Sequence, residues 1–119
     1  MKKLLFITFL LVFAYSNGQE TENLNTTKKE TPATIHAVSA YPNPFNARTR
    51  INFKSTKNQV VEFTVKNLLG KTVYRELFDA KEGYNAIPFI RNDIQKGMYI
   101  YSLQTELDLV SKRMVIRWV

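Results

Sequence analysis

A hexapeptide with two prolines, Tyr41-Pro42-Asn43-Pro44-Phe45-Asn46, limits the fold of this chain more than any other stretch. Each proline fixes its own φ at about −65° and moves the preceding residue toward extended geometry, so no helix can pass through. The two missing N–H groups also exclude a central strand. The hexapeptide is therefore predicted at a sheet edge or at a crossover between sheets, with Tyr41 and Phe45 as core anchors. An ordinary proline-rich turn is the alternative interpretation.

After this hexapeptide, apolar and polar residues alternate with period 2, and turn residues recur about every ten residues, as in all-β domains. The clearest strand is predicted at residues 59–66, where every second residue is apolar. Gly70 can adopt positive φ, so a turn there is predicted to join this strand to residues 72–78 as a hairpin. Further strands are predicted at residues 36–41, 50–54, 84–90, 98–104 and 110–119.

Three of the later segments carry information about their position in the fold. Pro88 predicts that residues 84–90 form an edge strand, because proline cannot donate to a neighbouring strand. Residues 98–104 are apolar on both faces, which predicts a central strand. Residues 92–97 are predicted to form a single helical turn that ends at Gly97. With no long helix in prospect, the fold class is an all-β, small antiparallel β-sandwich over residues 38–119.

The N-terminal residues have the pattern of a secretory signal peptide. Met1-Lys2-Lys3 is followed by an apolar run over residues 4–15 and by small residues, which predicts a signal peptide over residues 1–18 with cleavage between Gly18 and Gln19. The run is shorter than the roughly 20 residues that span a bilayer, although a buried helix or a membrane anchor is the alternative. This predicts passage through the general secretory machinery of the inner membrane.

Residues 19–37 are polar, with few apolar residues and no regular spacing between them. Such a segment buries too little apolar area to offset the entropy of ordering, so it is predicted to be a disordered linker.

The composition excludes most catalytic and metal chemistry. The chain has no cysteine, so disulfides, thiolate zinc sites and a cysteine nucleophile are absent. His36 is its one histidine, which excludes a Ser/His/Asp site and a histidine-rich metal site. Two pairs of carboxylates fall in predicted turns, Asp79 with Glu82 and Glu106 with Asp108. We therefore predict no enzyme activity, no catalytic residue, no metal and no cofactor.

The chain is basic throughout rather than in one cluster. Removal of residues 1–18 leaves 15 basic and 10 acidic side chains, so the net charge falls from +7 to +5. Because the excess is spread out and the protein is predicted to be exported, nucleic acid is not an expected partner. Attraction to an anionic glycolipid of the cell surface fits this charge better.

Short motifs recur in a fixed order from the hexapeptide to the end of the chain. They are Tyr41 to Asn46 with Thr49 and Ile51, Leu69-Gly70-Lys71 with Val73-Tyr74, Gly97-Met98-Tyr99 with Tyr101 and Leu103, and Lys112-Arg113-Met114-Val115-Ile116. In this order they resemble the C-terminal sorting domain, type A, of the type IX secretion system, also called the Por secretion system. The resemblance covers essentially the whole predicted sandwich.

The resemblance implies a seven-stranded immunoglobulin-like sandwich that acts as an address. In the family, cargo crosses the periplasm, an outer-membrane translocon recognises the domain, and a surface sortase cuts upstream of it. The cargo is then secreted or attached to anionic lipopolysaccharide at the cell surface. Carried over to matching positions, the residues recognised by translocon or sortase are Gly97, Tyr99, Lys112, Arg113, Met114 and Val115.

An edge strand could pair with a receptor strand, with charge from Lys112 and Arg113 and an apolar anchor at Met114 or Ile116. The alternative is that Lys112 and Arg113 keep an edge strand soluble and that Gly97 ends a turn.

Domains of this kind normally follow a large enzyme or adhesin, whereas here only residues 19–37 lie between the predicted signal peptide and the sandwich. Three explanations are open: a truncated gene product, a free-standing exported domain, which we favour, and a carrier of the short linker peptide. The alternative function is a free-standing adhesive module of the cell surface that binds carbohydrate or protein. Its binding surface would consist of Tyr84, Tyr99, Tyr101 and Trp118.

Overall fold

A computed structural model describes residues 32–118, which form an all-β sandwich as predicted. The strands are β1 (Ile35–Tyr41), β2 (Arg48–Ser55), β3 (Gln59–Asn67), β4 (Thr72–Ala80), β5 (Gly83–Ile90), β6 (Gly97–Gln104) and β7 (Leu109–Ile116). The predicted signal peptide and most of the predicted linker lie outside the described residues. Within residues 32–118 the structure contains no helix that could cross a bilayer.

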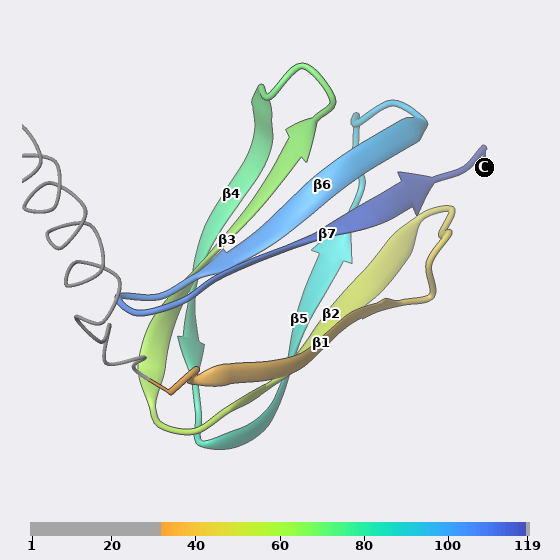
Figure 1. The fold of residues 1–119 in the computed structure, drawn as a ribbon. Helices are drawn as coiled ribbons and strands as arrows, with labels where there is room; N and C mark the ends of the chain where they lie inside the picture. Colours follow the sequence, from red (N-terminus) through yellow and green to blue (C-terminus); the bar gives the residue numbers. More distant parts are fainter. Residues whose placement is uncertain (1–31, 119) are drawn as a thin grey trace, which may run out of the picture. The chain divides into compact units, whose positions relative to one another are not determined.

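The seven strands form two antiparallel sheets that face each other (Figure 1). One sheet has the order β1-β2-β5 and the other the order β4-β3-β6-β7. The central position predicted for β6 is confirmed, as is the edge position that Pro88 predicted for β5. The β3–β4 hairpin is also confirmed, and Gly70 has a φ of 85° in its turn.

The core lies between the sheets and is built from the inward residues of the alternating pattern. Phe63 of β3 packs edge to face on Phe89 of β5, with ring centroids 5.7 Å apart, and so joins the two sheets. Phe45 packs on the same Phe89 ring at 6.0 Å. In β1 a bulge at Ala37, which has a φ of 53°, shifts the register so that Ile35 and Val38, three residues apart, both point inward. Every strand therefore contributes to one continuous core.

The two anchors predicted in the hexapeptide have different outcomes. Phe45 is buried, with 1% of its surface exposed, as predicted. Tyr41 is 76% exposed, so its prediction as a core anchor is wrong. The reason is the β1–β2 register, which pairs Tyr41 with Arg50 on the outer face of the sheet.

The ends of two strands also differ from the prediction. β1 begins at Ile35, three residues before the predicted start of the sandwich at residue 38, because Ile35 is buried in the core. β7 ends at Ile116, so Trp118 lies beyond the strand and is 73% exposed.

The segment between β5 and β6 is not the helical turn that was predicted. The amide of Ile94 donates to the carbonyl of Arg91 at 2.9 Å, and Asn92 has a φ of 49°. This geometry is a single tight turn rather than the start of a helix, and it places Ile94 against the core. Gly97, with a φ of 153°, opens strand β6 instead of ending a helix.

Candidate functional site

The residues predicted for recognition lie together in the antiparallel ladder between β6 and β7. Gly97 pairs with Ile116, Tyr99 with Met114, and Arg113 with Ile100. Val115 and Lys112 occupy the neighbouring pairs of the same ladder. The two segments therefore lie side by side, close to the C-terminus (Figure 1).

The side chains of this ladder divide between the core and the surface. Met114 and Ile116 are fully buried, so the expectation that one of them is an apolar anchor for a receptor is corrected: in the folded domain both belong to the core. Tyr99 is 8% exposed, and its hydroxyl donates to the carbonyl of Gln95 at 2.7 Å. Arg113 is exposed on the outer face, next to the half-buried Val115.

Lys112 faces the opening between the two sheets. Its ammonium group donates to the carbonyl of Val38 in β1 at 2.6 Å and thereby links β7 to the other sheet. A lysine at a sheet edge also discourages pairing with a further strand. In this structure the charged group of Lys112 is bonded within the domain, to the carbonyl of Val38.

The hexapeptide binds the outer edge of β7, and we call its two bonding residues, Asn43 and Phe45, the clasp. The side-chain amide of Asn43 donates to the carbonyl of Arg113 at 3.1 Å, and its oxygen accepts from the amide of Val115 at 3.0 Å. The backbone of Phe45 continues this pattern: its amide donates to Val115 at 3.0 Å, and its carbonyl accepts from Arg117 at 2.8 Å. The clasp therefore occupies backbone groups of β7 between Arg113 and Arg117, which a receptor strand would need in order to pair with this part of the edge.

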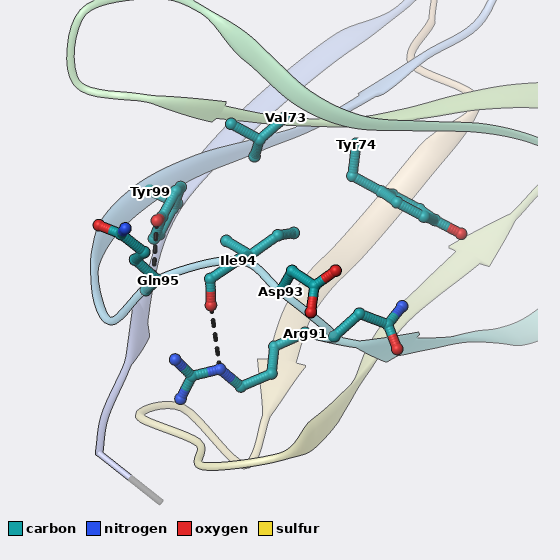
Figure 2. Close-up of a pocket in the computed structure, with 8 residues that line it drawn as sticks. Val73, Tyr74, Arg91, Asp93, Ile94, Gln95 and Tyr99 are labelled. Atoms are coloured by element: carbon teal, nitrogen blue, oxygen red, sulfur yellow. Dashed lines mark hydrogen bonds between the residues drawn. The ribbon is translucent and has the colours of Figure 1, made fainter.

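Arg91 joins three segments at the same end of the sandwich. Its guanidinium donates to the carbonyl of Ile94 at 3.1 Å (Figure 2). It also donates to the carbonyls of Asn46 at 3.2 Å and Arg117 at 2.6 Å. Nearby, the ammonium group of Lys96 lies 3.5 Å from the centre of the Trp118 ring, a cation–π contact. The C-terminal end of β7 is thus held by side chains from outside its own hairpin.

The family with the description "Secretion system C-terminal sorting domain" matches residues 39–117, which include both the clasp and the β6–β7 ladder. The chain belongs to this family. It carries a sorting domain of the type IX secretion system, a signal that interacts with that machinery and leads to secretion or attachment at the cell surface. The family is one of sorting signals rather than catalysts. No curated protein matches the chain significantly.

A shallow hollow of about 460 Å³ lies in the sorting domain between β4 and the turn at residues 91–95 (Figure 2). Apolar and aromatic side chains, those of Val73, Tyr74, Ile94 and Tyr99, line it together with polar residues of the turn. Tyr74, on its wall, donates a hydrogen bond to Glu76, which together with burial raises the pKa of Tyr74 to about 12 and keeps the phenol neutral. Across residues 32–118 no three carboxylate, histidine or cysteine side chains gather as metal ligands would.

The opposite end of the sorting domain is closed by Asp108. Its carboxylate accepts from the amide and hydroxyl of Thr34, both at 2.7 Å, and from the amide of Ile35 at 2.8 Å. Burial alone would raise the pKa of Asp108, but these hydrogen bonds and the neighbouring His36 lower it overall. Asp108 therefore holds the first residues of β1 against the turn before β7.

The bonding roles of Asn43 and Arg91 were not predicted from the sequence. Asn43 was recognised as part of a motif, yet its partners lie about 70 residues away in the chain. The carbonyls bound by Arg91 come from three segments, and no local pattern relates them. The one sequence feature that pointed to a contact between the hexapeptide and β7 is that the hexapeptide and the terminal motif occur together.

Proposed function

We propose that this domain is a non-catalytic export signal that the outer-membrane translocon recognises through the outer side of the β6–β7 ladder. The observation that carries this proposal is the clasp on β7. Since Asn43 and Phe45 already bond Arg113, Val115 and Arg117, the receptor cannot add a strand there while the clasp is in place. Recognition then depends on the side chains that point outward from the ladder.

Within the predicted recognition set, the six residues have different tasks. Arg113 and Val115 contact the receptor, because they lie on the outer face. Tyr99 and Met114 shape the ladder from inside, and Lys112 fixes β7 to β1. Gly97 permits the backbone geometry with which β6 begins, since a φ of 153° is rare for residues with a side chain. The other hexapeptide residues serve to present the clasp.

The remaining steps of the route follow from the predicted organisation of the chain. The signal peptide over residues 1–18 uses the general secretory machinery, and the protein passes through the periplasm before it reaches the translocon. A surface sortase cuts in the polar linker before Thr34, because Asp108 holds Thr34 and Ile35 in the folded domain. The product is then released or attached to anionic lipopolysaccharide.

A transplanted signal tests the export function. A fluorescent protein is placed between residues 1–18 and residues 32–119 and expressed in a bacterium with the type IX system and in a translocon-deficient strain. We expect fluorescence on the cell surface or in the medium of the first strain, and in the periplasm of the second. Periplasmic retention in both strains would contradict the proposal.

A matched pair of substitutions tests the recognition surface in the same fusion. Arg113→Gln removes an exposed charge of the ladder, and Arg75→Gln removes an exposed charge, paired with Glu62, from the outer face of β4 in the same sheet. We expect Arg113→Gln to reduce export at least about fivefold, the effect of roughly 1 kcal/mol of lost contact, and Arg75→Gln to have little effect. Equal export from both variants would exclude Arg113 as a contact residue.

A further inference from the structure

The outer face of the β1-β2-β5 sheet has a charge pattern that the export function does not use. None of the residues of these three strands is an aspartate or glutamate. Three basic side chains of β2, Arg48, Arg50 and Lys54, are exposed on this face. The face is therefore positive along its whole middle strand.

Exposed rings and apolar side chains flank these basic residues. Tyr41 and Pro88 pair with Arg50 from the two sides, so the three residues form one row across the sheet. Ile90 pairs with Arg48 in the adjacent row. Further along, Lys54 lies beside Tyr84, with its ammonium group 5.6 Å from the ring centre.

A hollow of about 410 Å³ lies in this face, between the two rows and the start of the hexapeptide. Tyr41, Arg48, Arg50, Pro88 and Ile90 line it. Below them, the hydroxyl of the buried Thr49 donates to the carbonyl of Pro42 at 2.6 Å and fixes the rim of the hollow. The volume is within the range of about 300–1,000 Å³ that is usual for small-ligand sites.

Neither arginine of the hollow is engaged within the domain. In the described part of the chain, no carboxylate forms an ion pair with Arg48 or Arg50, and their guanidinium groups make no hydrogen bond to another residue. An ion pair within residues 32–118 joins Arg75 to Glu62 on the other sheet. Two unpaired guanidinium groups two residues apart on one strand face can both reach the same ligand.

We propose that this hollow binds an acidic polysaccharide through its sugar carboxylates. Guanidinium groups bind carboxylates with two parallel hydrogen bonds, and the 76% exposed ring of Tyr41 offers a flat face for a sugar ring. The proposal rests on the proposed export function in one respect only: export brings the domain to the cell exterior, where it meets the polysaccharide. It is separate from a covalent attachment, which would concern the chain before Thr34.

The test measures binding of a short oligogalacturonate to the purified chain by calorimetry at low salt. A neutral malto-oligosaccharide of equal length is the control for ligand charge. We expect the acidic sugar alone to bind, and the double variant R48Q/R50Q to weaken binding at least about tenfold, as expected for lost bidentate contacts. Tyr41→Ala is expected to weaken binding by a smaller factor.

The double variant R75Q/K66Q controls for net charge, because it removes the same charge from the outer face of the other sheet. An equal loss of affinity in this variant would overturn the proposal, since binding would then depend on net charge alone. Binding of both sugars, of neither sugar, or of anionic lipid vesicles in place of the sugar would also overturn it. Arginine side-chain NMR signals of the unmodified chain give a second measurement: signals of Arg48 and Arg50 must shift on titration, and that of Arg75 must not.

These outcomes are independent of the export test. The sugar is added to purified protein, so a chain that fails to be exported can still bind, and an exported chain can still fail to bind.

Discussion

The two edge strands of the four-stranded sheet, β7 and β4, are protected in opposite ways. The outer edge of β7 is bonded by the clasp from the β1–β2 loop. The outer edge of β4 receives no hydrogen bond from another segment in the described part of the chain, and its sequence carries the charges of Arg75, Glu76 and Asp79. Both devices prevent pairing with a further strand, one by occupation and the other by charge.

This difference indicates what the domain must preserve. The charges on β4 protect its edge without a contact from another segment of the described chain. β7 needs the hexapeptide, which belongs to the loop between two strands of the other sheet, so β7 keeps its geometry only while the whole sandwich is folded. A signal built in this way would be presented only by a folded domain, which agrees with the proposed readout of its outer face.

The largest effect is expected from Phe45→Ala, which removes the buried ring of the clasp. Loss of a fully buried phenylalanine costs about 3–5 kcal/mol, enough to unfold much of so small a domain. Urea unfolding measures the free energy. Tyr41→Ala is the matched control, because it removes an exposed ring from the same hexapeptide. Equal losses in both variants would show that the hexapeptide acts as a unit and that burial does not distinguish its two rings.

Asn43→Ala is expected to have an intermediate effect. Two hydrogen bonds to the β7 backbone are lost, at about 1–2 kcal/mol together. Hydrogen exchange of the Val115 amide should accelerate roughly tenfold, because its acceptor is removed. In the control Asn67→Ala, the lost side-chain oxygen accepts from Leu69 and Lys71 within the β3–β4 turn, so Val115 should be unchanged. Unaltered exchange of Val115 in Asn43→Ala would mean that the clasp does not protect the edge.

Acid should lower the stability of the domain through Asp108, which bonds the start of β1 to the turn before β7. Its pKa lies below that of an unfolded aspartate, about 3.9, so its contribution to stability is complete above that pH and is lost as the pH falls through the folded-state pKa. The difference in unfolding free energy between the natural chain and Asp108→Asn should therefore be constant from neutral pH to about 4 and shrink below it. A difference that grows on acidification would contradict this sign.

The smallest effect is expected on the β4 edge. Leu77 is 65% exposed there, so Leu77→Thr should change the free energy of unfolding by no more than about 0.5 kcal/mol. Urea unfolding and gel filtration measure stability and self-association. A large loss, or a dimer, would show that β4 has a partner and that its edge is not protected by charge alone.

Local chemistry made much of the fold predictable from the sequence. Alternation with period 2 marked β3, the freedom of Gly70 marked its turn, and Pro88 placed β5 at an edge, because each depends on residues that are neighbours in the chain. The order of the motifs also indicated the family, which the match over residues 39–117 confirmed. The prediction of a helical turn at residues 92–97 was wrong, because the packing of Ile94 and the hydrogen bonds of Arg91 outweigh the local preference for a helical cap.

The sequence by itself thus determined that the chain forms a β-sandwich and that its hexapeptide cannot lie in a central strand. Only the tertiary structure decided that Phe45 is buried and Tyr41 exposed, although both are aromatic residues of one hexapeptide. It also decided that Asn43 bonds β7. Both outcomes depend on strand register and on contacts between residues about 70 positions apart, and the chain forms those contacts only when the two sheets come together.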